Sequence, residues 1–353
     1  MKRQTIYLFF SKNTMNMNKV IKVALATTLL AATASTTYAR SWRVNNDVTK
    51  KAHFVDINAA MASEEVQAGD TLYLDPNTNL SSEQRVTKQV TIVGPGWGGG
   101  EVYYARAVIS GILIITAAET KIVGLYLTNA IHIRADYVTV ERCKVTSTIL
   151  TGGATGQFAT IRNCYLDSGS TNIYGEGGTN SRSANWTVEN SIIIHHGAYN
   201  RCIERLYCAT IRNNMLITWG GEQCWALCDL GNALVQNNII MQLYAPVITI
   251  YNCDGTFTNN VISQDYGTSN YIVDNNLASV LTGDYESYTL VEGSPAIGGG
   301  TDGQDVGIFG GLYPYVANNG LPKGYPYYTK NIVGAKAVDG KVNVSLKVKI
   351  EDE

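Results

Sequence analysis

Two histidines, two arginines and one glutamate lie close together in the middle of the chain. His195 and His196 follow three consecutive isoleucines, and Arg201, Glu204 and Arg205 come within the next nine residues. Imidazole exchanges a proton near pH 7, a carboxylate serves as acid or base, and a guanidinium binds carboxylate groups. We therefore predict proton transfer on a sugar, with His196, Glu204 and Arg205 in the catalytic roles.

Further residues recur at one phase of a repeat and are predicted to bind substrate. Trp219 follows Asn214 by five residues, as His196 follows Ser191, and Asp265 has the same phase two repeats later. His132 and Arg134 alternate with two inward isoleucines and form a second outward patch. The predicted substrate-binding residues are His195, Arg201, Trp219, Glu222, Asp265, His132 and Arg134.

Each of these residues also has a purely structural interpretation. Paired histidines at a strand end are commonly exposed polar residues, and outward arginines commonly pair with acids on neighbouring strands. A zinc site built from His195, His196, Cys202 and Cys208 lacks any standard ligand spacing, so no metal site is predicted there. Two carboxylate pairs are candidates for glycoside hydrolysis only because their sequence spacing is close to one repeat. These pairs are Glu204 with Glu222 and Asp229 with Asp254.

The elements that would position these side chains follow from a repeated phrase, a short apolar strand that runs into an Asn-centred turn. Its copies end at positions 143, 164, 191, 214, 238, 260 and 276. A period of twenty-odd residues marks a repeat architecture, and the short strands leave no room for crossover helices. We predict an all-β fold, a right-handed parallel β-helix of about ten coils over residues 70–300.

The Asn of each turn has a physical role, because Asn tolerates the left-handed backbone conformation that a sharp bend requires. Side-chain amides that recur at the same place in successive coils can also hydrogen-bond to one another. The sequence therefore predicts that Asn163, Asn213, Asn237 and Asn259 form one internal ladder.

The two ends of the stack need protection, since an open strand edge invites aggregation. Apolar spacing over residues 56–62 predicts a short capping helix with Asp56 as its N-cap. Strict alternation over residues 341–350, preceded by Asp339 and Gly340, predicts a C-terminal hairpin. The predicted division is a signal region over 1–39, a β-helix domain with its cap over 40–320, and a hairpin tail over 321–353.

The first 39 residues have the features of an export signal. Lys19 and Lys22 precede an uncharged run that ends in a small-x-small cleavage site at Ala39, and Met17 is the more ordinary start. No Cys follows closely enough for a lipid anchor, and the run is too short to span a bilayer. We therefore predict a periplasmic, cell-surface or secreted protein without a transmembrane segment.

The net charge of the chain limits the classes of partner that it can bind. Removing the signal region leaves 22 basic against 29 acidic residues, a net charge of about −7, which disfavours a nucleic-acid partner.

Seven cysteines recur about one repeat apart, as in Cys143 with Cys164 and Cys208 with Cys228. Ladders of buried free thiols are the main interpretation, and one or two disulfides are the alternative.

Three stretches together resemble secreted right-handed β-helix proteins of the pectate-lyase-like superfamily, in the form found in Bacteroidetes. They are GDTLYLDP at 69–76, the Asn-turn coils, and GSPAIGGGTDGQDVGIFGG at 293–311. The resemblance implies a polysaccharide partner, a monomer, and a polyuronate lyase or glycoside hydrolase. A non-catalytic carbohydrate-binding or cell-surface structural protein is the alternative on the same fold.

The resemblance also raises the question of calcium, which lyases of this superfamily hold with several acids while an Arg or Lys removes the proton. Calcium takes six to eight oxygen ligands. The acids of this chain are scattered over different phases of the coil, so calcium stays open as a cofactor without a predicted ligand set.

Overall fold

The computed structural model describes most of the chain after the predicted signal. Residues 1–39 and 40–353 form two separate units, and of residues 1–39 only Ala39 is described. The described residues are 39–98, 106–151, 155–175, 183–197, 199, 201–220, 223–243, 249–274, 276–283, 288–317, 320–321, 326–333 and 344–350.

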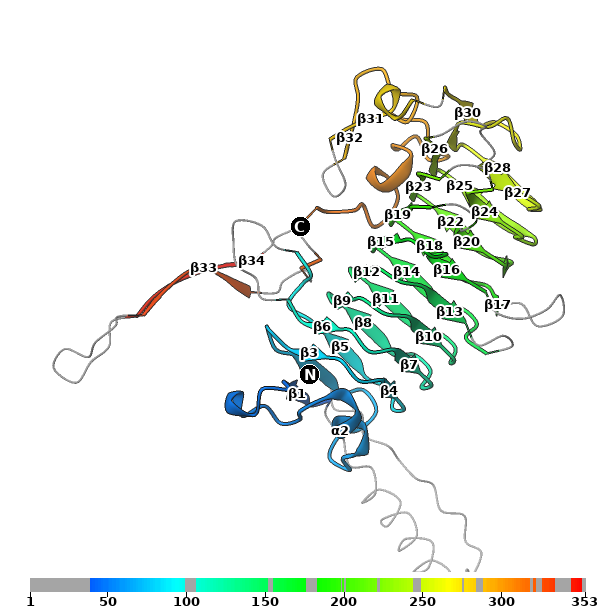
Figure 1. The fold of residues 1–353 in the computed structure, drawn as a ribbon. Coiled ribbons are helices and arrows are strands. Elements are labelled where there is room, and N and C mark those ends of the chain that lie inside the picture. The colour runs from blue at the N-terminus through cyan, green and yellow to red at the C-terminus, as the bar shows by residue number, and fades with distance from the viewer. Residues whose placement is uncertain are drawn as a thin grey trace, which may run out of the picture. The chain divides into compact units, whose positions relative to one another are not determined.

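Three parallel sheets make up the stack, and the chain passes from one sheet to the next in every coil (Figure 1). Sheet A consists of β1 (Ser41–Val44), β2 (Thr71–Leu74), β5 (Thr91–Val93), β8 (Lys121–Val123), β11 (Thr139–Glu141), β14 (Thr160–Arg162), β18 (Thr187–Glu189), β22 (Thr210–Arg212), β25 (Ala233–Gln236) and β28 (Gly255–Thr258). Sheet B consists of β3 (Asn79–Leu80), β6 (Val108–Ile109), β9 (Tyr126–Leu127), β12 (Lys144–Val145), β15 (Tyr165–Ser168), β19 (Ile192–His195), β23 (Met215–Thr218), β26 (Ile239–Gln242), β29 (Val261–Ile262) and β30 (Tyr271–Ile272). Sheet C consists of β4 (Gln84–Val86), β7 (Leu113–Ile115), β10 (Ile131–Ile133), β13 (Ile149–Thr151), β16 (Ile173–Tyr174), β20 (Arg201–Glu204), β24 (Trp225–Cys228) and β27 (Ile250–Tyr251).

This arrangement confirms the predicted all-β parallel β-helix and its size, because sheets A and B each contain ten strands. Side chains alternate along each strand, so every coil sends apolar residues inward from all three sheets. On sheet A, Val140, Ile161, Val188 and Ile211 occupy successive coils in register and are fully buried. The core is therefore a set of aliphatic columns that run along the stack.

The turn between sheets A and B contains the predicted left-handed residue in coil after coil. Asn163, Asn190, Asn213, Asn237 and Asn259 have φ between 47° and 58°. Arg142 takes the same conformation in the degenerate first copy, with φ 53°. The conformational role assigned to Asn from the sequence is confirmed.

The internal amide ladder, however, lies one residue later than predicted. Asn214 Nδ2 donates to Asn238 Oδ1 at 3.0 Å, Asn238 Nδ2 donates to Asn260 Oδ1 at 3.0 Å, and Asn260 Nδ2 donates to Asn270 Oδ1 at 2.9 Å. The left-handed turn rotates the backbone between the two Asn positions, so the first side chain points out of the stack and the second points in. The predicted ladder through Asn163, Asn213, Asn237 and Asn259 was therefore wrong.

The outward Asn side chains bind the C-terminal segment, which runs back along the stack beside β23 and β19 (Figure 1). Asn259 donates to Gly299 O, Asn237 exchanges hydrogen bonds with Thr301, Asn190 donates to Gly310 O, and Asn163 donates to Tyr313 O. Beneath this segment lies a second apolar cluster on the outer face of sheet B. Its buried members include Ile194, Ile217, Met241, Val306 and Ile308.

The N-terminal end is covered as predicted. Helix α2 (Ile57–Ala62) is N-capped by Asp56, which accepts from Ala59 N at 2.7 Å. It packs on β4, the edge strand of sheet C, where Asn58 Nδ2 donates to Glu83 O. At the other end of the chain, β33 (Pro326–Val333) and β34 (Val344–Ile350) form the predicted antiparallel hairpin. The predicted turn at Asp339 and Gly340 lies outside the described residues.

All seven cysteines are free thiols, as the main interpretation predicted, but only five are buried, and Cys208 and Cys253 are partly exposed. Cys143 and Cys164 occupy one column, as the spacing predicted, while Cys228 pairs in register with Glu204 and Tyr251 instead of Cys208. No helix among the described residues is long and apolar enough to cross a membrane.

Candidate functional site

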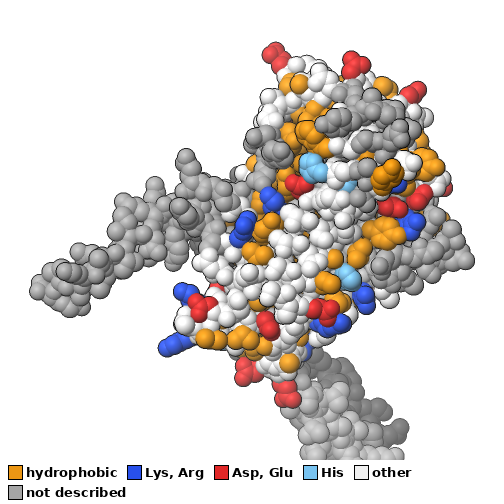
Figure 2. Space-filling model, in the orientation of Figure 1, with side chains coloured by type: hydrophobic (Ala, Val, Ile, Leu, Met, Phe, Trp, Pro, Cys, Tyr) orange, Lys and Arg blue, Asp and Glu red, His pale blue; other side chains and the backbone are white. Residues whose placement is uncertain are grey.

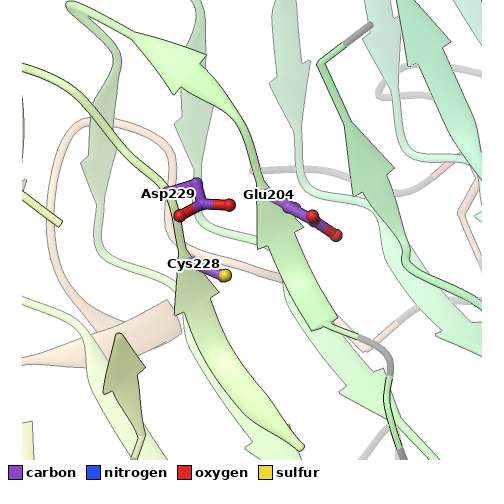
Figure 3. Close-up of side chains that lie close together, drawn as sticks. All are labelled: Glu204, Cys228 and Asp229. Atoms are coloured by element: carbon purple, nitrogen blue, oxygen red, sulfur yellow. The ribbon is translucent and has the colours of Figure 1, made fainter. Parts of the chain in front are cut away.

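Two carboxylates and a thiol meet on the outer face of sheet C, at the ends of β20 and β24. Ligand atoms of Glu204, Cys228 and Asp229 all lie within 4.8 Å of one another (Figure 3). Register explains the meeting, because Glu204 pairs with Cys228 across adjacent coils, and Asp229 is the next residue. We call Glu204, Asp229 and the flanking Arg201 and Arg205 the acid cluster.

Left-handed turns aim the charged groups of this cluster. Arg205, Asp229 and Asn252 occupy the same turn position in three successive coils, with φ of 60°, 53° and 50°. Arg205 Nε lies 3.5 Å from Glu204 Oε1 and 3.9 Å from Asp229 Oδ2, and Asn252 Nδ2 donates to Asp229 Oδ1 at 2.6 Å. Asn and Asp tolerate this left-handed conformation, whereas it is uncommon for Arg.

Burial dominates the electrostatics of Glu204. Burial raises the pKa of Glu204 above its ordinary value, and the two arginines, Arg201 and then Arg205, lower it less than burial raises it. The negative charge of Asp229 raises that pKa further. Glu204 therefore keeps a proton to higher pH than an exposed glutamate does, which is what a general acid requires.

Aromatic rings hold the two arginines in place. The guanidinium of Arg201 lies 4.0 Å from the centre of the Trp225 ring, which in turn stacks on Tyr251 at 3.9 Å and 13°. Arg205 Nη1 donates to Tyr174 Oη at 2.5 Å. Along the side of the stack that sheet C forms, apolar side chains alternate with acidic, basic and histidine side chains (Figure 2). This is a face on which both charge and ring contacts are available to a ligand.

A polar hollow opens next to the acid cluster, on the ridge between sheets C and A. Its volume is about 270 Å³, just under the roughly 300 Å³ at which ordinary ligand sites begin, so it suits a single sugar ring. The side chains that line it are Tyr207, Asp229, Leu230, Asn252, Cys253 and Asp254, together with Gly231. Asp229 thus faces Glu204 on one side and the hollow on the other.

His196 belongs to a separate cluster at the end of β19. Its Nε2 lies 3.1 Å from Asp167 Oδ1, and its ring stacks on Trp219 with centroids 6.0 Å apart. The pairing of His196 with Trp219 was predicted, while Asp167 was not. Strand β20 lies between this cluster and Glu204, about 10 Å at 3.3 Å per residue. The predicted catalytic set of His196 with Glu204 and Arg205 is therefore divided between two places, and only the last two residues share one.

Two other predicted binding residues lie apart from His196 and Trp219. His195 is fully buried, with Nδ1 3.0 Å from Ser168 O and Nε2 3.1 Å from Gly197 O, and burial lowers its pKa. Strand alternation turns it inward because Ile194 and His196 point outward. Asp265 is exposed, and the partly buried Leu243 lies between it and Trp219, so it does not join the His196 cluster.

The remaining predicted residues have mixed outcomes. His132 and Arg134 lie together, with ring Nδ1 and Nη2 3.4 Å apart. His132 is on the same face of sheet C as Glu204, in one register column that runs through Leu150 and Tyr174. Arg201 is on that face beside Trp225. Glu222 lies outside the described residues.

Sequence reasoning missed the partners that complete both clusters, namely Asp167, Tyr174, Trp225, Cys228 and Tyr251. Asp229 had been considered only with Asp254, and both do line the hollow. A usable signal was the inward column of sheet C itself, Ile173, Ile203, Leu227 and Ile250. Counting one residue past each member gives Tyr174, Glu204, Cys228 and Tyr251 directly.

The acid cluster is a poor fit to a metal ion. Only two of its members are carboxylates, short of the six to eight oxygens that calcium takes. Burial raises the pKa of the Cys228 thiol to about 11, and a thiol must lose its proton to become a ligand. Two guanidinium groups already supply positive charge there.

Comparisons with known proteins give no relative from which to transfer a role. No protein-family model matches the chain, no curated protein matches it, and no solved structure matches it.

Proposed function

We propose that this chain is an exported glycoside hydrolase that cleaves a polysaccharide at the acid cluster. The observation that carries the proposal is the pair formed by Glu204 and Asp229, whose oxygens lie within 4.8 Å of each other, with the pKa of Glu204 raised. Glycosidic bond cleavage requires two carboxyl groups at close range, and the one that acts as the general acid must hold its proton to a higher pH than usual.

In this proposal Glu204 donates its proton to the glycosidic oxygen as the bond from that oxygen to the anomeric carbon breaks. Asp229 attacks the anomeric carbon and forms a glycosyl ester. Water then attacks the same carbon, Glu204 takes a proton from the water, and the ester bond to Asp229 breaks. The short distance between the acids favours this two-step route, because an inverting enzyme needs about 6.5 to 9.5 Å to fit a water molecule.

The surroundings fit a sugar. The hollow beside Asp229 holds one ring, with Asn252, Asp254 and Tyr207 available to its hydroxyl groups. In this proposal Arg205, whose side chain is 43% exposed beside the two acids, also binds a carboxylate on a neighbouring sugar, which favours an acidic polysaccharide. The predicted export signal agrees with a substrate outside the cytoplasm.

The test incubates the chain from residue 40 with polygalacturonate, alginate, arabinoxylan and mixed-linkage β-glucan, and follows reducing ends and unsaturated products separately. Glu204→Gln and Asp229→Asn are each expected to lower kcat by two to four orders of magnitude. Glu65→Gln, which changes an exposed acid in the N-terminal cap, is the matched control with wild-type kcat.

Three outcomes would contradict the proposal. Unsaturated products would identify a lyase, and inversion at the anomeric carbon, seen by proton NMR of the first product, would exclude a covalent ester on Asp229. Retention of a glycan by the protein without any turnover would favour the non-catalytic carbohydrate-binding alternative.

A further inference from the structure

Two exposed aromatic residues occupy a backbone position for which their side chains are poorly suited. Tyr137 and Phe158 have φ of 59° and 57° at the turn that leads from sheet C to sheet A. The coil before them places Glu119 at this position, and the later coils place Asn185, Cys208 and Asn232 there, with φ of 58°, 61°, 50° and 49°. A left-handed conformation is unfavourable for a bulky residue and tolerable for Asn, so the fold itself gives no reason for the aromatic rings.

The two rings form one rigid apolar surface. They stack with centroids 4.9 Å apart and an interplanar angle of 8°, and Tyr137 and Phe158 stay 54% and 43% exposed. Neither ring belongs to the buried core of the stack. The backbone conformation therefore displays the rings to solvent instead of burying them.

The same ridge leads to the hollow beside the acid cluster. The turn position of Tyr137 and Phe158 continues along the stack through Asn185 to Cys208, as shown by the hydrogen bonds that link the turns. Cys208 directly follows Tyr207, which lines the hollow. Coils lie about 4.8 Å apart, so Phe158 and Tyr137 lie two and three coils from Cys208, about 10 and 14 Å along the ridge.

We propose that Tyr137 and Phe158 are a distal sugar-binding site for the same polysaccharide chain that the acid cluster cleaves. This inference rests on the proposed function for its ligand, since the aromatic pair lies on the ridge that carries the hollow. Sugar rings present apolar C–H groups that pack against aromatic rings, and the hydroxyl groups at their edges stay in water. The chain would lie along the ridge, with one ring in the hollow and rings several units away against the aromatic pair.

The experiment replaces both rings with the residue that other coils use. The double variant Tyr137→Asn/Phe158→Asn suits the left-handed turn, so it is expected to fold with the circular dichroism of the wild type. Affinity electrophoresis through gels that contain each of the four polysaccharides measures retention. Loss of roughly 60 Å² of apolar contact predicts about tenfold weaker retention on the polysaccharide that retains the wild type.

Two further variants separate this inference from the proposed function. Tyr73→Asn removes a comparably exposed ring from the outer face of sheet A, and its retention is expected to equal that of the wild type. Glu204→Gln is expected to lose cleavage and keep retention. Unchanged retention of the double variant, an equal loss in Tyr73→Asn, or no retention of the wild type on any of the four polysaccharides would each overturn the distal site. If the double variant loses retention tenfold but the wild type cleaves none of the polysaccharides, the distal binding site is supported and the proposed hydrolase activity is refuted.

Discussion

Replacing Asn238 with Ala tests the internal ladder on which the later coils depend. The Asn238 amide donates to Ile211 O, Gln236 O and Asn260 Oδ1, and its oxygen accepts from the backbone N–H and the side chain of Asn214. The Ala variant leaves the buried Asn214 N–H without that acceptor, at about 1 to 3 kcal/mol, and removes hydrogen bonds from two carbonyls at about 1 kcal/mol each. The expected loss of unfolding free energy is about 3 to 5 kcal/mol.

The matched control changes the neighbouring residue, whose side chain points out of the stack. Asn237→Gly keeps the left-handed turn and loses only the two hydrogen bonds with Thr301, so about 1 to 2 kcal/mol is expected. Guanidinium unfolding followed by circular dichroism gives both free energies, and hydrogen exchange locates the weakened coils at β23 and β26. If Asn238→Ala is no more destabilising than Asn237→Gly, the ladder does not stabilise the stack as argued.

Three further perturbations test the acid cluster and the thiols. Because burial raises the pKa of Glu204, the folded state binds that proton more tightly than the unfolded state does, and stability falls as the pH rises through the interval between the two pKa values. Urea titrations from about pH 4 to pH 7 should therefore show Glu204→Gln becoming more stable relative to the wild type, and a constant difference would contradict this. Arg201→Gln removes a positive charge that lowers the pKa of Glu204. The pH at which kcat falls on the alkaline side of its pH profile should therefore move upward. If that pH stays the same or moves downward, Glu204 is not the general acid. Mass spectrometry after brief maleimide treatment should find Cys208 modified in the folded protein, with Cys143 and Cys164 modified only after unfolding, and early labelling of the latter two would show that the core is open.

The fold could be predicted because its signal recurs in every coil. The repeated strand-and-Asn-turn motif gives the length of one coil, and the left-handed turn explains why Asn recurs in it. The stack and its approximate number of coils could therefore be predicted from local chemistry. The ladder was misplaced by one residue because the turn reverses which side chain points inward. The phrase itself contains both candidates, Asn213 and Asn214, and the backbone rotation between them is not visible in the spacing.

The acid cluster was harder to predict because each sheet keeps its own register. Counting from the Asn turn works on sheet B, where it correctly paired His196 with Trp219. The connections that lead into sheet C differ in length from coil to coil, so the same count fails there. Glu204 was paired with Glu222 at a spacing of 18, whereas the strands pair it with Cys228 at a spacing of 24. To align residues of successive coils on sheet C, the count should start from the inward apolar residues of sheet C itself.

The C-terminal segment bears on the order in which the protein can be completed. Residues 299, 301, 310 and 313 bind the turns at Asn259, Asn237, Asn190 and Asn163, so this segment, which is synthesised after all of these coils, meets them in reverse order. Until it arrives, Ile194, Ile217 and Met241 form an uncovered apolar strip along sheet B. During synthesis from the N-terminus, the protein therefore passes through an intermediate in which the stack is nearly complete and its apolar strip on sheet B is still exposed to solvent. Residues 299–313 therefore cover this side of the stack from its C-terminal coils toward its N-terminal coils.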